Sequence, residues 1–110
     1  MRQLPHPLPR QITLTRILSA LSDPIRLAIV ARLAHRPGEH QWNDFADLGV
    51  APSTLSHHMK TLRLAGLIHH RKSGTRCHVS LHPDLATRFP RLLPTILTHA
   101  RNEKRVMNSA

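Results

Sequence analysis

The sequence predicts a mainly helical domain that carries one small β-hairpin, an α+β fold class, and three features of the chain indicate it. Apolar residues repeat at helical spacing in several segments between positions 12 and 101. Two short strand-like runs, 67–71 and 76–81, flank a turn at 72–75 that contains Gly74. A chain of 110 residues is long enough for one domain with one modest core.

Two helices are expected to begin the domain. The first starts near Ile12 and has an apolar stripe at i, i+3, i+4 and i+7, formed by Leu14, Ile17, Leu18 and Leu21. The second is expected to start at Pro24, because Asp23 is a favourable N-cap and proline suits the first helical position. It should end at Pro37–Gly38.

Residues 39–49 are harder to assign. Trp42, Phe45 and Leu48 are spaced by three, which fits a short helix of about two turns that ends at Gly49. The segment holds two of the chain's three aromatic residues, so we assign Trp42 and Phe45 to the core. An aromatic lid over a bound ligand is the alternative for this pair.

The segment STLSHHMKTLRLAGLI, residues 53–68, predicts a helix with two contrasting sides that ends at Gly66. Leu55, Met59 and Leu62 fall at i, i+4 and i+7 and define the side expected to be buried. The opposite side is polar or cationic apart from one leucine, and it comprises Ser53, His57, Lys60, Thr61 and Leu64. We therefore expect one face of this helix to present hydroxyl, imidazole and ammonium groups to its surroundings.

The hairpin and a final helix are expected to complete the domain. Arg71, Lys72 and Arg76 lie at the tip and shoulders of the hairpin, and a single helical turn is expected after Pro83. The final helix starts near position 90 and has an apolar stripe formed by Leu92, Leu93, Ile96 and Leu97. Pro94 either kinks this helix or marks its start.

The two ends of the chain differ in composition from the domain between them. Residues 1–11 contain three prolines and predict a disordered, basic, proline-rich arm. Residues 102–110 are polar and predict a flexible tail, which leaves 12–101 as the folded domain.

The charge of the chain points to a polyanionic partner. Sixteen Lys and Arg residues against six Asp and Glu residues give a formal charge of +10, which favours nucleic acid first and an anionic membrane second. No apolar run is long enough to span a bilayer, so no membrane insertion is expected. Cys77 is the single cysteine, which excludes an internal disulfide and fits a reducing compartment, and we expect the cytoplasm.

Two helices at a tight turn, followed by a basic hairpin, match a winged helix-turn-helix. An α-helix fits the major groove of DNA, where short hydroxyl and imidazole side chains read base edges. Cations next to such a helix neutralise phosphates, which positions the protein without specifying sequence. For this chain the cations expected at the DNA backbone are Lys60, Arg63, Arg71, Lys72 and Arg76.

The run LSDPIRLAIVARLA (21–34), followed by 53–68 and a basic hairpin, resembles the ArsR/SmtB family of bacterial winged-helix transcriptional repressors over roughly 12–99. The resemblance implies a homodimer on a near-palindromic operator in double-stranded DNA, released by a ligand, metal or oxidation event that remains unidentified here. It assigns base reading to Ser53, Thr54, Ser56 and His57, with Thr61 on the same face, and places Thr75 and the rest of the 72–76 wing at the minor groove or backbone. Dimerisation through the first and last helices falls on Leu14, Ile17, Leu18, Leu92, Leu93, Ile96 and Leu97.

The chain departs from the family pattern at two places. Leu64 stands where many relatives have Glu, and the stretch EHQWNDFADL lacks the Cys-x-Cys of metal-sensing members, so we expect no metal and no cofactor. His99 and Glu103, at i and i+4, form an alternative metal pair. Cys77, flanked by Arg76 and His78, is an alternative redox switch, although a lone cysteine commonly packs as a small apolar residue.

The composition also bears on three classes of function other than a sequence-specific regulator. The charge and the basic arm also suit a non-specific, architectural DNA-binding protein. Ten histidines and Cys77 leave a metal- or redox-responsive sensor as a further alternative. An enzyme is not expected, because the six acidic residues form no pair and no phosphate loop or nucleophile motif is present.

Overall fold

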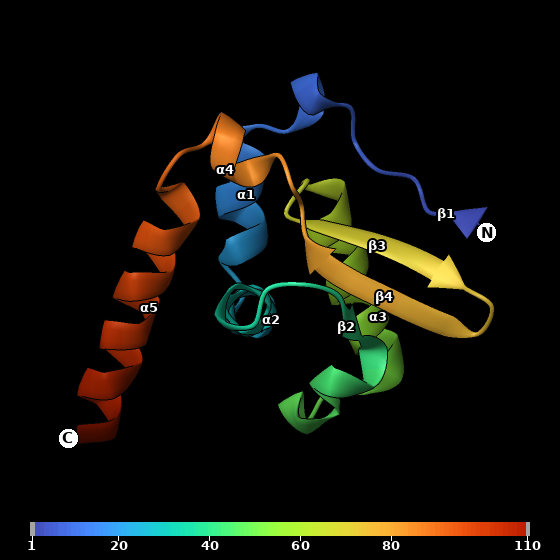
Figure 1. Ribbon diagram of the computed structural model, residues 1–110. Coiled ribbons are helices and arrows are strands. Elements are labelled where there is room, and N and C mark those ends of the chain that lie inside the picture. Colours follow the sequence, from blue (N-terminus) through green and yellow to red (C-terminus); the bar gives the residue numbers. More distant parts are fainter. Residues whose placement is uncertain (1, 110) are drawn as a thin grey trace.

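The computed structural model describes the backbone of residues 2–109 and the side chains of 4–103, and it contains the mainly helical fold with a hairpin that the sequence predicts (Figure 1). Three helices precede the hairpin and two follow it. In chain order the helices and main strands are α1 (Leu14–Leu21), α2 (Pro24–His35), α3 (Pro52–Leu64), β3 (Ile68–Ser73), β4 (Arg76–Leu81), α4 (Leu85–Arg88) and α5 (Leu92–Ser109). The shorter elements are β1 (Arg2–Gln3), η1 (Pro9–Gln11), β2 (His40–Gln41) and η2 (Trp42–Leu48).

The strands form one antiparallel sheet in the order β1–β3–β4–β2. Its centre is the predicted hairpin, in which Ile68 pairs with Leu81 and Ser73 pairs with Arg76. Gly74 has a φ of 62° in the two-residue turn, a backbone conformation that favours glycine. Short β2 extends the sheet on the β4 side, so the segment that precedes α3 is tied to the hairpin that follows it.

Side-chain caps and prolines set the helix starts. The Oδ1 atom of Asp23 accepts hydrogen bonds from the backbone N–H groups of Ile25 and Arg26 at 2.8 and 3.1 Å, which confirms the predicted start of α2. The helix α5 begins at Leu92, after Arg91 with a φ of 65°. Pro94 therefore falls in the first turn of α5, where its missing N–H interrupts no intrahelical bond.

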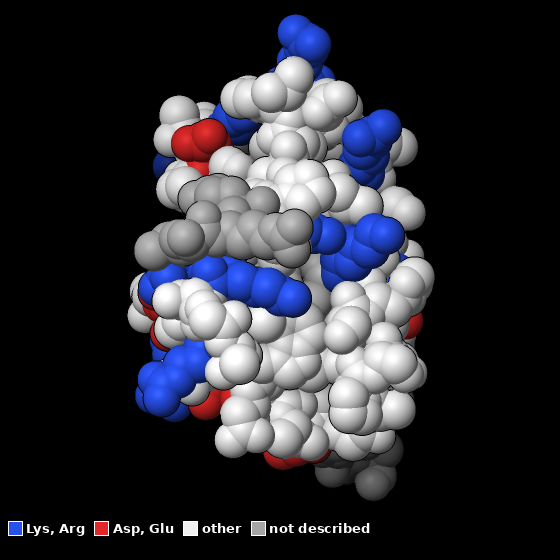
Figure 2. All heavy atoms as spheres, turned by 90° about the vertical axis from the view of Figure 1, so that its right-hand side faces the viewer, with Lys and Arg blue, Asp and Glu red and all other residues white. Residues whose placement is uncertain are grey.

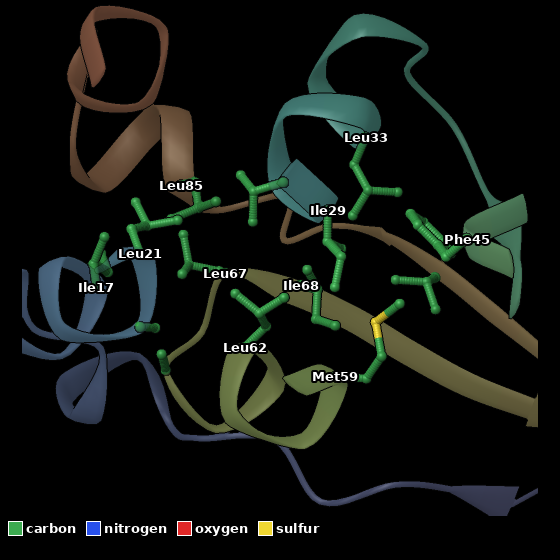
Figure 3. Close-up of a cluster of buried hydrophobic side chains, with 14 of the residues drawn as sticks. Ile17, Leu21, Ile29, Leu33, Phe45, Met59, Leu62, Leu67, Ile68 and Leu85 are labelled. Carbon is green, nitrogen blue, oxygen red and sulfur yellow. The ribbon is translucent and has the colours of Figure 1, made fainter. Parts of the chain in front are cut away.

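The main core cluster is formed by side chains from α1, α2, η2, α3 and α4, together with the hairpin (Figure 3). From α3 come the three predicted residues Leu55, Met59 and Leu62, which are 5%, 0% and 0% exposed. Phe45 of η2 is buried among them, while Trp42 packs against the core and stays half-buried. Gly49 ends η2 in the left-handed conformation, as the sequence predicts.

The structure differs from the sequence prediction at both ends of the chain. The arm expected to be disordered, 1–11, contains β1 on the edge of β3, and the backbone N–H of His70 donates to Nε2 of His6 at 3.0 Å. The unpaired edge of β3 offers backbone groups that a short extended segment satisfies. At the other end α5 continues to Ser109 instead of ending near position 101, since 101–109 lack proline and glycine.

Helix α5 lies at the side of the molecule opposite the hairpin tip and the N-terminus (Figure 1). Leu92, Leu93 and Ile96 near its start pack against the core and remain half-buried. Within residues 2–109, no helix combines the length and apolar character needed to cross a membrane.

The close approach of Gly66 to Ile12, which precedes α1, generates a stability prediction. Gly66 has a φ of 82°, and a Cβ there would lie 2.6 Å from Cγ1 of Ile12, whereas a Cβ at Gly49, with a φ of 73°, would meet nothing within 4 Å. Both alanine variants should lose roughly 1–2 kcal/mol through the left-handed backbone. Gly66→Ala should lose about 1–3 kcal/mol more through the collision. Urea unfolding measures both, and equal losses would contradict this account of the contact.

Candidate nucleic-acid interface

One face of α3 carries the polar side chains predicted to read bases. Because Leu55, Met59 and Leu62 are buried, the residues on the far side of α3 are turned outward. The exposed residues are Ser53, Thr54, Ser56, His57 and Lys60, together with Leu64 at 42% exposure. Thr61 is half-buried at the margin of this face. We call these exposed polar residues and Thr61 the α3 face.

The turn of the hairpin supplies further exposed cations. Lys72, Thr75 and Arg76 are all exposed at the end of the β3–β4 hairpin, which we call the wing. Lys and Arg side chains outnumber Asp and Glu side chains on the side of the molecule that carries the hairpin tip (Figure 2). A surface of this kind attracts a polyanion over distances of about a Debye length, near 10 Å.

Arg71, also expected at the DNA backbone, is held by a carboxylate. Its Nε and Nη2 atoms donate to Oε2 and Oε1 of Glu39 at 2.6 and 2.8 Å, a bidentate pair. The hydrogen bond from Arg71 lowers the pKa of the Glu39 carboxyl, and the same contact raises the pKa of Arg71. Arg71 therefore ties β3 to the loop before β2, and its charge is compensated within the protein.

Arg63, which the sequence predicts at the DNA backbone, does not lie on the exposed face of α3. The side chain is 7% exposed, and its Nε and Nη1 atoms have no hydrogen-bond partner among the described side chains. Arg63 comes four residues after Met59, so it lies at the border of the apolar stripe and turns inward with it. Burial lowers the pKa of this guanidinium.

The seven residues predicted for dimerisation divide into three groups by their exposure. Leu14 and Leu18 of α1 are 46% and 47% exposed. Ile17 and Leu97 are instead 1% and 6% exposed, so both are already buried within the single chain. The remaining three are half-buried near the start of α5: Leu92, Leu93 and Ile96.

The alternative metal and redox residues are not brought into clusters. His99 and Glu103 are exposed on α5, and no group of three or more His, Cys, Asp or Glu residues that could hold a metal ion occurs in the described part of the chain. Cys77 is half-buried on β4, opposite Lys72 on β3.

A cavity of about 470 Å³, which sequence patterns do not predict, opens between α3 and the wing. Arg63, Trp42 and His70 line it, with Leu4 from the N-terminal arm. Arg63 was assigned to the surface and the arm was assigned to disorder, so the sequence could not bring these residues together.

The fold and the α3 face define a helix-turn-helix protein that binds DNA. A family model described as a helix-turn-helix domain matches residues 21–71. The uncharacterized HTH-type transcriptional regulator YceK of Bacillus subtilis is 37% identical over 83 residues, 74% of this chain and 83% of YceK. The HTH-type transcriptional regulator Rv2034 of Mycobacterium tuberculosis is 42% identical over 71 residues, 62% of this chain and 63% of Rv2034.

Solved structures share the architecture. The homodimeric winged helix-turn-helix DNA-binding domain Mb0332 from Mycobacterium bovis, described as a possible ArsR-family regulator, has a TM-score of 0.63 at 27% identity, over 81% of this chain and 79% of that one. The transcriptional repressor BigR from Xylella fastidiosa has a TM-score of 0.58 at 28% identity, over 74% and 83%. The chain belongs to the ArsR family of winged helix-turn-helix transcriptional regulators, a non-enzymatic family.

The burial of His70 generates a pH prediction. Burial, followed by the nearby charge of Arg63, lowers the pKa of His70 from 6.5 to about 4. The folded state therefore favours the neutral imidazole of His70. The contribution of this imidazole to the free energy of unfolding is complete above pH 6.5 and is lost as the pH falls toward 4. Between pH 7 and pH 4.5 this group should remove about 2.5 kcal/mol from the free energy of unfolding.

Urea unfolding of His70→Leu at both pH values measures this contribution. Between pH 7 and pH 4.5, the free energy of unfolding of the variant should fall by about 2.5 kcal/mol less than that of the wild type. His99→Leu, at an exposed position on α5, is the matched control and should follow the wild type. Parallel pH dependence in the wild type and in His70→Leu would contradict the assignment.

Proposed function

We propose that this chain is a homodimeric transcriptional repressor that binds a near-palindromic operator through the α3 face and the wing. Two related proteins support the finer parts of this proposal: BigR is described as a transcriptional repressor and Mb0332 as homodimeric. For the present chain, the repressor role, the dimer and the operator are inferences.

The observation that carries the proposal is the exposure of short donors on α3 opposite its buried leucines. Ser53, Thr54, Ser56 and His57 are exposed along the first two turns of α3, where a helix inserted into the major groove brings its side chains to base edges. Hydroxyl and imidazole groups both donate and accept hydrogen bonds, so they can distinguish one base pair from another. We assign base reading to these four residues and to Thr61 at the margin.

Backbone contacts are assigned to exposed cations. Lys60 on α3 and Lys72 and Arg76 on the wing are free of carboxylate partners among the described side chains. Thr75 adds an exposed hydroxyl at the turn. Contacts of this kind supply affinity and salt dependence without sequence preference.

The proposed dimer pairs the exposed apolar residues of α1 with the half-buried apolar residues near the start of α5. Leu14 and Leu18 leave apolar area in water that the single chain does not cover. Two copies related by a two-fold axis would present two α3 helices to half-sites one helical turn apart, about 34–36 Å.

Two substitutions separate base reading from backbone contact. His57→Ala should weaken binding to a selected operator by about tenfold while affecting random DNA little, because it removes a contact to a base. Arg76→Ala should weaken binding to both DNAs similarly and reduce the salt slope by about one, because it removes a phosphate contact. Fluorescence anisotropy at several salt concentrations measures both.

The control for these variants is His99→Ala, which removes an exposed imidazole from α5 and should bind DNA as the wild type does. Equal losses on operator and random DNA for both test variants would contradict the base-reading assignment. Footprints without a protected palindrome would favour the architectural role that the net charge of +10 also suits.

A charge placed on α1 tests the dimer. Leu18→Asp puts a carboxylate where an intersubunit apolar contact is proposed, and it should weaken dimerisation at least about tenfold. Leu8→Asp is the matched control, because Leu8 is 50% exposed but lies in the N-terminal arm. Sedimentation velocity measures both, and an undiminished dimer of the Leu18→Asp variant would contradict the proposed interface.

A further inference from the structure

The cavity between α3 and the wing has the dimensions of a small-molecule site. Its volume of about 470 Å³ lies within the range of about 300–1,000 Å³ that is typical of ligand pockets. Ser56, Lys60 and Arg63 line it from α3, and Lys72 and Thr75 line it from the wing. The cavity thus lies between the two surfaces that we assign to DNA.

The cavity contains a buried cation without a counter-charge. Arg63 is 7% exposed, and its Nε and Nη1 atoms make no hydrogen bond within the described part of the chain. A guanidinium keeps its proton even where burial lowers its pKa, so Arg63 remains a cation. Such a group normally has an anionic partner, because an unpaired buried charge is costly.

The described side chains supply no such partner. The ion pairs of Asp44, Asp47 and Glu39 among them are made with Arg32, Arg71 and two histidines, and none involves Arg63. The cavity lining adds two more cations, Lys60 and Lys72, and contains no carboxylate. An anion entering from outside is therefore the partner that this arrangement of charges lacks.

The remaining walls suit the organic part of a ligand. Trp42 and Leu4 contribute apolar surface, and Trp42 packs against the ring of His70 at a centroid distance of 5.1 Å. His70 is 6% exposed and its Nε2 atom has no hydrogen-bond partner among the described residues. The ring of His70 therefore adds an uncharged wall next to Trp42.

We propose that this cavity binds a small organic anion, whose carboxylate or phosphate oxygens contact Arg63 and whose apolar part lies against Trp42 and Leu4, and that the bound anion competes with DNA. Competition rests on the proposed function, because Ser56, Lys60, Lys72 and Thr75 are shared between the cavity and the DNA surface. Binding of the anion itself does not depend on it.

A duplex phosphate has the same chemistry as the proposed ligand. Arg63, at 7% exposure, is far less accessible than Lys60 and Lys72, which are exposed beside it. A phosphate held in a duplex is restrained by its neighbours, whereas a small anion can move into the cavity toward the guanidinium of Arg63. The structure therefore favours the free anion, and the experiment distinguishes the two sources.

The first part of the test uses no DNA. Trp42 is the only tryptophan, so its fluorescence reports on the cavity when the full chain is titrated with phenyl phosphate, benzoate or inorganic phosphate at constant ionic strength. Phenyl phosphate should give a saturable change at a concentration about tenfold below that for neutral phenol. It should also slow alkylation of Cys77, the only cysteine, which lines the same cavity. Absence of both responses with all three anions would overturn the proposal.

Arg63→Met tests the contact with the guanidinium, with the exposed Arg101→Met as a control of equal charge change. Arg63→Met should weaken phenyl phosphate binding at least about tenfold and leave the thermal midpoint unchanged or higher, because it removes an unpaired buried charge. Arg101→Met should bind as the wild type does. Unchanged phenyl phosphate binding by Arg63→Met would overturn the proposal. If this variant does not fold, the effect of phenyl phosphate on Cys77 alkylation in the wild type decides.

The second part adds a selected operator. Phenyl phosphate should weaken operator binding by the wild type about tenfold more than sodium chloride of equal ionic strength, and Arg63→Met should not respond. If Arg63→Met instead loses operator affinity and free anions never compete, the partner of Arg63 is a DNA phosphate and the proposal is overturned. A wild type that binds no DNA would refute the proposed function, while the fluorescence and alkylation results would still decide anion binding.

Discussion

The insertion of three α3 side chains into the core is the constraint on which the interface depends. Leu55, Met59 and Leu62 are at most 5% exposed, and they fix the rotation of α3 about its own axis. Because successive helical residues are turned by 100°, this rotation decides which side chains face outward. The same packing brings β3 against α3 through Ile68, so the wing is held beside the helix by one continuous apolar cluster (Figure 3). Apolar packing thus positions a polar surface.

The few acidic residues serve the structure and leave the positive field largely uncompensated. Asp23 caps α2, while Glu39 and Asp47 bind Arg71 and Arg32. The first of these contacts fixes the start of a helix, and the other two tie the residue before β2 to β3 and η2 to α2. A net charge of +10 then remains for a polyanion, and among the Lys and Arg side chains that the structure describes only Arg63 is buried.

Most of the fold could be predicted from the sequence because its signals are local. The Asp23–Pro24 start of α2, the apolar stripe of α3 and the glycine turn of the wing each follow from a few neighbouring residues. The features that the sequence does not predict depend on contacts between residues far apart in the chain. Arg2 and Gln3 pair with an edge of β3 that lies some seventy positions later in the chain, and Arg63 is turned inward by the stripe beside it. The burial of Ile17 and Leu97 likewise depends on packing that helical periodicity alone does not distinguish from an intersubunit contact.

The most direct measurement of the central claim is a residue-resolved one: NMR chemical-shift changes of the full chain on titration with a selected operator duplex. The account predicts that the largest changes fall on the exposed residues of α3 between 53 and 61 and on the wing turn at 72–76. The amides of the core residues Ile29 and Leu33 in α2, which are at most 1% exposed, should change little. Changes concentrated on α2 or α5, with α3 unaffected, would contradict the account.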